Sequence, residues 1–205
     1  MFFDTPSRFV HTLLLTVALI LIAGPAFAQD PAVEIRQMLS DRDAEIKKLL
    51  GPAGSAVSEA TRETLRDVIN GLIDFETMGK DALGPFWDDL TADQRTRFVT
   101  VFADIVKGQS LADLDPYRAS VSYESVSVDG TEAKVVTRTV FDEVPMAVIY
   151  TLALRDNSWM ATDIVLDEVS TVDGYSRSFQ SMIRRRGFDT LMERLEKRRD
   201  GMNTD

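Results

Sequence analysis

The sequence contains no cysteine and only one histidine, His11. Without cysteine there are no disulfide bonds, so the fold must be stabilised by the packing of its core. His11 lies in a segment that we expect to be removed on export. The mature chain then has no Ser-His-Asp or Cys-His nucleophile and no zinc site with His or Cys ligands. These absences argue against an enzyme, and we predict a protein without catalytic residues.

Long hydrophobic runs are also scarce, and the clearest one covers residues 13–23. Its eleven residues are too few to cross a bilayer, which takes about 20. Gly24-Pro25 follows the run, and Ala26-Phe27-Ala28 fits the small-x-small pattern of a cleavage site. The pattern predicts a cleavable secretory signal over residues 1–28 and a periplasmic mature protein. An uncleaved N-terminal anchor is the alternative.

The remaining residues, 29–205, are expected to form a single domain, since their number fits one domain. The formal net charge of the chain is −10, and the signal contains one acid and one base, so the mature chain keeps this charge. An acidic surface argues against general nucleic-acid binding, which needs cations to displace counterions. Residues 184–199 are the exception, with seven basic and three acidic side chains. They favour either contact with anionic groups or the ordinary placement of cations near helix C-termini.

Hydrophobic periodicity divides the mature chain into helices, then strands, then helices. Apolar residues with helical spacing predict helices over residues 35–50, 65–73 and 75–83, and Asp74 is the expected N-cap of the third. A fourth helix begins at Thr91, because Thr91 and Gln94 have the spacing of a capping box. Helical spacing returns over residues 172–195, with Gly187 as the expected break.

Between the helical regions, from residue 119 to residue 165, the period changes to two. The pattern predicts four strands, with a bulge near Glu124 or Ser125 and a type I′ turn at Asp129-Gly130. Strands joined by short turns form an antiparallel meander with one face on the core. We therefore predict an α+β domain in which N- and C-terminal helices cover a four-stranded meander sheet.

The large apolar side chains on these faces admit two interpretations. Periodicity indicates that they are buried, which is typical of an ordinary core. The same positions also line a cavity if the helices stand away from the sheet, and the pattern does not distinguish the two. Asp163, inside an apolar strand, is expected to accept hydrogen bonds or cap a helix rather than act as a base.

An ordered set of residues extends through most of the mature chain. Its first half comprises Phe75-Glu76, Met78, Leu83-Gly84, Trp87, Thr91, Phe98 and Phe102. Its second half comprises Val148, Tyr150, Leu152, Trp159, Asp163-Ile164-Val165, Val169-Ser170, Tyr175, Phe179 and Arg186-Gly187-Phe188-Asp189 with Leu191. In order and spacing this set resembles the MlaC family, the periplasmic phospholipid-binding proteins of the Mla lipid-asymmetry system, also called toluene-tolerance auxiliary proteins.

The resemblance implies a soluble carrier that holds phospholipid acyl chains in an apolar cavity between sheet and helices. It also implies a shuttle between an outer-membrane lipoprotein complex and an inner-membrane ABC transporter, with no cofactor. The residues that it implies line the cavity are Phe75, Met78, Phe98, Phe102, Val148, Tyr150, Ile164, Tyr175 and Phe179. Ser110 and Ser176 depart from the family pattern, which usually has Tyr and Arg there.

Two other functions are compatible with the residues themselves. One is a non-catalytic interaction or chaperone-like module with a solid core. The other is an enzyme for a hydrophobic substrate, in which Asp163 and a tyrosine form an acid–base pair. An internal cavity would favour the carrier over the solid-core module.

Overall fold

The computed structural model describes Met1 and residues 30–202, so the predicted signal sequence lies almost entirely outside the described part of the chain. The helices α1 to α5 and the 3-10 turns η1 and η2 are α1 (Pro31–Leu50), α2 (Glu59–Asn70), α3 (Phe75–Leu83), η1 (Gly84–Phe86), α4 (Ala92–Ser110), η2 (Asp115–Arg118) and α5 (Thr171–Met202). The strands are β1 (Val121–Asp129), β2 (Glu132–Phe141), β3 (Val144–Arg155), β4 (Ser158–Leu166) and β5 (Val169–Ser170). No helix within residues 30–202 is both long enough and apolar enough to span a bilayer.

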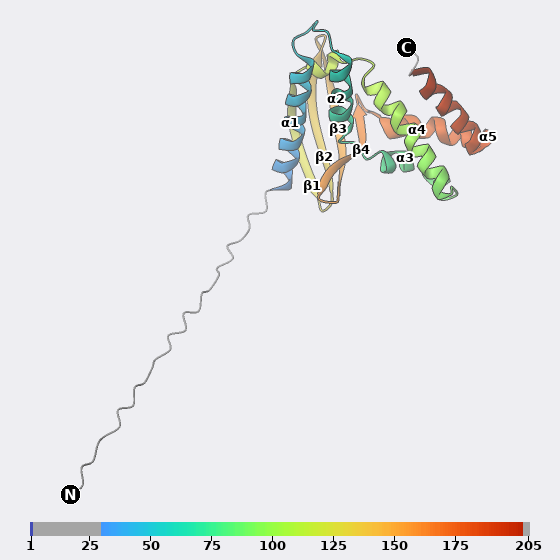
Figure 1. Ribbon diagram of the computed structural model, residues 1–205, viewed down its shortest axis with the longest axis horizontal. Coiled ribbons are helices and arrows are strands. Elements are labelled where there is room, and N and C mark those ends of the chain that lie inside the picture. The colour runs from blue at the N-terminus through green and yellow to red at the C-terminus, as the bar shows by residue number, and fades with distance from the viewer. Residues whose placement is uncertain (2–29, 203–205) are drawn as a thin grey trace.

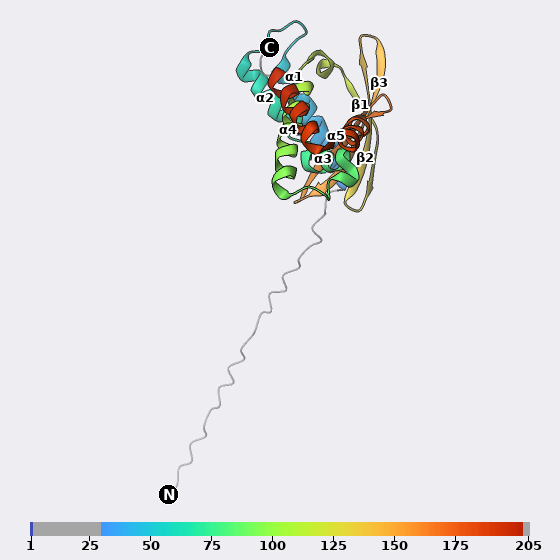
Figure 2. The ribbon, with the colours of Figure 1, turned by 90° about the vertical axis from the view of Figure 1, so that its right-hand side faces the viewer.

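The strands form one antiparallel sheet in the order β1-β2-β3-β4-β5. Figure 1 shows α1 and α2 in front of this sheet, with α3, α4 and α5 grouped beside β4. Figure 2, seen from the α5 side, shows the sheet as a separate layer on the right, with most of the helices to its left. The predicted α+β meander is confirmed, with a fifth strand of two residues added at the β4 edge.

The helix ends follow from local sequence signals. The Asp74 carboxylate accepts a hydrogen bond of 2.9 Å from the Thr77 amide, as expected for the N-cap of α3. At the start of α4, Thr91 and Gln94 form both hydrogen bonds of the predicted capping box. The second helix begins and ends earlier than predicted, because α2 runs from Glu59 to Asn70 and Gly71 follows.

Leu72 and Ile73, which we had expected in that helix, pair instead with β4. The Ala161 amide donates to the Leu72 carbonyl at 2.7 Å, and the Asp74 amide donates to the Ala161 carbonyl at 2.9 Å. This short parallel bridge between Ile73 and Ala161 attaches the start of α3 to the sheet. Backbone pairing therefore overrides the apolar periodicity that predicted a helix extending through Ile73.

The turns between strands also show one difference from the prediction. The predicted bulge is present between Tyr123 and Ser125. In the first hairpin Asp129 pairs with Glu132, so the loop is residues 130–131 and has positive φ only at Gly130. A type I′ turn needs positive φ at both central residues, so the predicted turn type is wrong; one positive φ at the first position fits type II′. The other three turns, residues 142–143, 156–157 and 167–168, each have two positive φ values.

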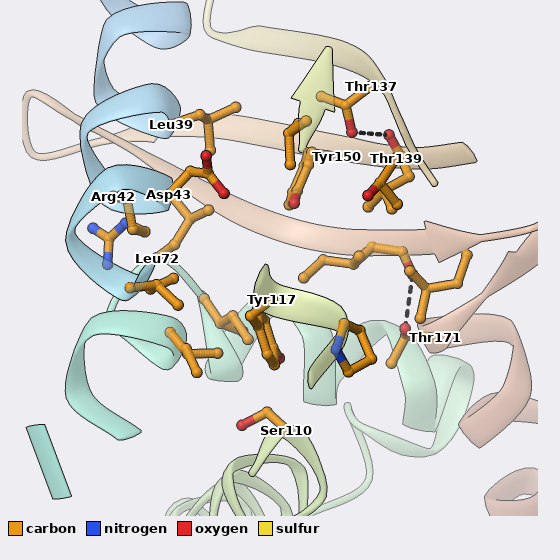
Figure 3. A pocket seen from close by; sticks show the side chains of 18 of the residues that line it. Leu39, Arg42, Asp43, Leu72, Ser110, Tyr117, Thr137, Thr139, Tyr150 and Thr171 are labelled. Atoms are coloured by element: carbon orange, nitrogen blue, oxygen red, sulfur yellow. Dashed lines mark hydrogen bonds between the residues drawn. The ribbon is translucent and has the colours of Figure 1, made fainter. Parts of the chain in front are cut away.

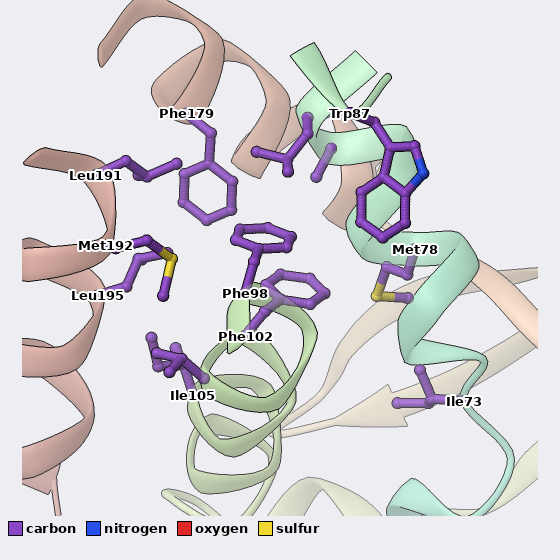
Figure 4. Close-up of a cluster of buried hydrophobic side chains, with 13 residues drawn as sticks. Ile73, Met78, Trp87, Phe98, Phe102, Ile105, Phe179, Leu191, Met192 and Leu195 are labelled. Carbon is purple, nitrogen blue, oxygen red and sulfur yellow. The ribbon is translucent and has the colours of Figure 1, made fainter. Parts of the chain in front are cut away.

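The largest buried cluster, which we call the helical core, lies among α3, α4 and α5 (Figure 4). The Phe98 and Phe102 rings are stacked with centroids 5.7 Å apart, and the Phe179 ring meets both edge-on. Helical geometry in α5 is interrupted at Gly187, where φ is 82°, as the sequence predicted. The part of α5 after this break contributes Leu191 to the same cluster. Aromatic stacking and the folded-back helix therefore make this half of the molecule solid.

The packing of the helical core predicts that Gly79 of α3 cannot be replaced by a larger residue without loss of stability. A Cβ atom at Gly79 would lie 3.0 Å from Phe98 Cε1 and 3.4 Å from Phe102 Cδ1. Gly79→Val should lower the free energy of unfolding by about 2 kcal/mol, because overpacking forces the stacked rings apart. Urea denaturation of the mature protein measures this change.

The control is Gly174→Ala in α5, where no atom lies within 4 Å of an added Cβ. This substitution should leave stability unchanged or raise it by up to about 1 kcal/mol, since alanine is the better helix former. Equal losses at Gly79 and Gly174 would contradict the assigned close packing of α3 on α4.

Candidate functional site

A cavity of about 630 Å³ lies between the inner face of the sheet and the helices. Figure 3 shows it from close by, with α1, the end of α4 and the strands around it. Its lining is predominantly apolar, and side chains of β2, β3 and β4 form its sheet wall: Thr137, Thr139, Met146, Val148, Tyr150 and Ile164. Residues of β1, α1, α2, α3, α4, η2 and the start of α5 form the remaining walls.

The cavity exists because the helices contact the sheet mainly along two of its strands. Helix α1 packs against β1, and α3 and α5 pack against β4. The inner positions of β2 and β3 near the first hairpin are filled, since Val135 and Leu152 pack in a second core with Ile35 of α1. Farther along β2 and β3, the inner positions face the hollow instead. Side chains of β2 and β3 still alternate between the two faces of the sheet here, but no helix packs against those on the inner face.

The polar groups in the cavity wall differ in whether they have hydrogen-bond partners within the protein. Thr137 is 2% exposed, and its hydroxyl donates to the Val148 carbonyl at 3.0 Å. Thr139 lies two residues farther along β2, and its buried hydroxyl has no hydrogen-bond partner among the described residues. Arg42 of α1 donates through Nη1 to the Val68 carbonyl. The buried Nε of Arg42 has no such partner in this part of the chain.

Four tyrosine side chains add hydroxyl groups to the wall without adding charge. Burial raises the pKa of Tyr150, Tyr123, Tyr117 and Tyr175 above the ordinary value of 10.0. The pKa of Tyr123 reaches about 12, because nearby Asp43 adds to the effect of burial. All four phenols are therefore neutral at physiological pH. The wall that they form suits an apolar ligand.

Five of the nine predicted site residues line the cavity: Met78, Val148, Tyr150, Ile164 and Tyr175. The other four lie outside its lining. Phe98 and Phe102 are fully buried in the helical core, and Phe179 is buried beside them. The Phe75 ring packs against the edge of that core, with Lys107 Nζ 5.2 Å from its centroid. Periodicity identified these faces as buried, but it did not show which of them face empty space.

Several lining residues were absent from the sequence prediction. Thr137 and Thr139 continue the inward alternation of β2 after Ala133 and Val135. The strand period could therefore have identified them, but they are polar residues and the prediction considered only apolar ones. Residues of α1 and η2, including Leu39 and Tyr117, had no signal, because only the tertiary fold brings them to the sheet. Of the two departures from the family pattern, Ser110 lines the cavity. Ser176 does not, and its hydroxyl accepts a hydrogen bond from Gln180.

Asp163 has the hydrogen-bonding role that the sequence predicted. Its Oδ1 accepts from the amides of Ile164 and Val172 at 2.9 and 3.1 Å. Its Oδ2 accepts from the Ser170 hydroxyl at 2.6 Å. These bonds attach the first turn of α5 to β4 and engage both carboxylate oxygens. Within residues 30–202 no group of three or more His, Asp or Glu side chains is arranged to hold a metal ion.

The two threonines of β2 give a matched test of the cavity wall. Thr139→Val should raise the free energy of unfolding by about 1 kcal/mol, because it removes a buried hydroxyl without a partner. Thr137→Val should lower it by about 1 kcal/mol, because it removes the bond to Val148. Chemical denaturation of both variants measures the difference, and effects of the same sign would contradict the assigned environments.

The raised pKa of Tyr123 predicts a loss of stability in alkali. The unfolded chain loses this proton near pH 10.0, whereas the folded chain keeps it until about pH 12. The contribution of Tyr123 is therefore fully present below pH 10.0 and is lost progressively above it. Tyr123→Phe should make the free energy of unfolding fall less steeply between these two pH values. Parallel pH profiles of wild type and variant in urea denaturation would contradict this.

Comparisons with known proteins agree with this architecture. No match was found among curated proteins. Among solved structures the chain is similar to a phospholipid-binding protein from Ralstonia solanacearum, solved in complex with a phospholipid. The TM-score is 0.69 at 22% identity, covering 85% of this chain and 99% of that one, which shows a shared fold. The sequence model of the MlaC protein family matches residues 44–197, from α1 into the last part of α5. The chain therefore belongs to the MlaC family.

Proposed function

We propose that this protein is a periplasmic carrier that binds the acyl chains of a phospholipid in the cavity between the sheet and the helices. The observation that supports this most directly is a largely apolar cavity of about 630 Å³ in a member of the MlaC family. Its volume lies within the range of about 300–1,000 Å³ that is typical of ligand pockets. The structural relative from Ralstonia solanacearum binds a phospholipid on the same fold.

The energetics of lipid transport require such an enclosure. Two acyl chains contain roughly 30 methylene groups, and each is worth about 0.8 kcal/mol when removed from water. Exposing them would therefore cost more than about 20 kcal/mol. Side chains such as Val148 and Ile164 supply apolar surface at the sheet wall, and the tyrosines remain neutral. Contacts between the acyl chains and the cavity wall replace the contacts that the chains lose on leaving the bilayer, and no chemical reaction is needed.

The mouth of the cavity lies where its lining residues are exposed. Gln109, Ala112 and Asp113 are exposed at the end of α4 and in the loop after it, and Leu166 is exposed at the end of β4. The acyl chains then extend inward from this mouth toward Tyr150, and the headgroup stays near water. Selection among headgroup alcohols should be weak, since they do not enter the cavity.

The proposed setting of the carrier is the periplasm, between an outer-membrane lipoprotein complex and an inner-membrane ABC transporter. The predicted signal over residues 1–28 supports export, and family membership supports this pair of partners. Residues 29–205 are then the mature lipid-binding domain. The sequence has no glycine-rich phosphate loop for a nucleotide, so energy for directional transport comes from a partner.

The two alternative functions have less support. A solid-core interaction module does not need an internal space of this size beside its sheet. An enzyme with Asp163 as its base would have to free a carboxylate whose two oxygens already accept three hydrogen bonds. Lipid binding, by contrast, requires no rearrangement of the Asp163 hydrogen bonds.

The direct experiment is native mass spectrometry of the purified mature protein, followed by solvent extraction and lipid identification. We expect one diacyl phospholipid per chain. A mass without ligand that persists after incubation with phospholipid vesicles would contradict the carrier function.

A blocking substitution tests the location of the ligand. Val148 of β3 lines the cavity, whereas the next residue, Ile149, points to the opposite face of the sheet. The indole of Val148→Trp should exclude about two methylene groups at about 0.8 kcal/mol each, which lowers the retained phospholipid about tenfold. Ile149→Trp is the control and should retain the wild-type amount.

Both variants are compared by lipid content per chain after exchange with vesicles, and by their thermal unfolding. A folded Val148→Trp protein with full lipid content would show that the acyl chains bind elsewhere.

A further inference from the structure

A second hollow, of about 390 Å³, adjoins the mouth of the cavity. It is more open than the cavity and shares four wall residues with it: Gln109, Leu166, Thr171 and Tyr175. Its outer walls come from β5 and from both parts of α5, which are folded back on each other at Gly187. We call it the headgroup hollow, because a molecule leaving the cavity at this point enters it.

The boundary between the two spaces is held by Tyr175. Its hydroxyl donates a hydrogen bond to Gln109 Oε1, which joins α5 to the end of α4. Its ring packs against Phe102 and Phe179, with centroid distances of 5.1 and 5.2 Å. The apolar ring and its polar hydroxyl therefore lie where the lining changes from apolar to polar.

The polar groups of the headgroup hollow are suited to an anion. Arg198, in the last part of α5, is exposed and lines it. No hydrogen bond or ion pair joins Arg198 to any residue that the structure describes. No carboxylate is among the residues that line the hollow. Arg198 therefore has an unneutralised positive charge beside the cavity mouth, in a chain whose net charge is −10.

The hydroxyl groups around Arg198 differ in their availability. Ser170 donates to Asp163, and Thr171 donates to the Ile164 carbonyl at 2.7 Å. Both are thus engaged in holding α5 on β4. Ser178, one turn after Gly174, lines the hollow and has no partner among the described residues. Arg198, Ser178 and Nε2 of Gln109, whose Oε1 accepts from Tyr175, are the side-chain donors left for a ligand among the described residues.

We propose that the headgroup hollow binds the phosphate ester of the carried phospholipid, with Arg198 and Ser178 as its hydrogen-bond donors. The inference rests on the proposed carrier function. A guanidinium group binds phosphate oxygens through two parallel N–H donors. Every phospholipid has this phosphate, whatever alcohol is attached to it. The contact therefore holds the lipid at the mouth without selecting among headgroups, and it separates phospholipids from lipids that lack phosphate.

The test compares two lipids with identical acyl chains, a phosphatidylcholine and the corresponding diacylglycerol. Mature wild-type protein, Arg198→Ala, Arg198→Glu and the control Arg194→Ala are incubated with vesicles that contain both. Lipid bound per chain is then measured by mass spectrometry. Arg194 is exposed on the same helix, one turn away, and does not line the hollow.

We expect Arg198→Ala to lower the bound phosphatidylcholine about threefold, the size of an exposed charge pair, and to leave the bound diacylglycerol unchanged. Arg198→Glu should lower it further, because the carboxylate repels the phosphate. Arg194→Ala should retain wild-type amounts of both lipids.

Three results would overturn the inference. Unchanged phosphatidylcholine in both Arg198 variants would show that no phosphate contact exists. Equal loss of both lipids would show that Arg198 supports only the structure. Arg198-dependent binding of inorganic phosphate to lipid-free protein, with bound phosphatidylcholine unaffected by either Arg198 substitution, would assign the hollow to free phosphate. A wild-type protein that takes up neither lipid would instead remove the carrier function, and this inference with it.

Discussion

The cavity depends on where the helices are attached to the sheet. Helix α1 packs on β1, while α3 and α5 pack on β4, so the inner faces of β2 and β3 are left partly uncovered. A protein interior normally closes such a gap, because each unfilled space loses dispersion contacts. The backbone pairing of Leu72 with Ala161 and the Asp163 hydrogen bonds to α5 hold the helices at the β4 edge. These attachments keep the space open.

The helical core and the sheet region differ in how completely they are packed. The helical core, with its stacked Phe98 and Phe102 rings, is densely filled and supplies much of the buried apolar surface. The sheet half is filled near the first hairpin and hollow beyond it. A carrier needs both features, because an empty cavity contributes little stability of its own. The stability contributed by the helical core compensates for the contacts missing around the cavity.

Polarity increases from the inside of the proposed lipid site to its mouth. The buried, neutral Tyr150 lies in the cavity wall, Tyr175 and Gln109 form the boundary, and Arg198 lies outside it. An amphipathic lipid has the same order of groups, from acyl chain through ester to phosphate. The basic C-terminal segment, which stood apart from the acidic remainder in the sequence, thus contributes a cation where the phosphate is expected.

The sequence by itself determined the order of the main elements, the capping of α4 by Thr91 and Gln94, the meander, and the absence of disulfide bonds, because these depend on local patterns and composition. The wall of the cavity was decided by the tertiary structure. Phe98 and Val148 both belong to buried apolar faces, yet one is packed in the helical core and the other faces the hollow. Periodicity reports only which face turns away from water. Whether another element fills the space opposite that face depends on contacts between residues far apart in the chain.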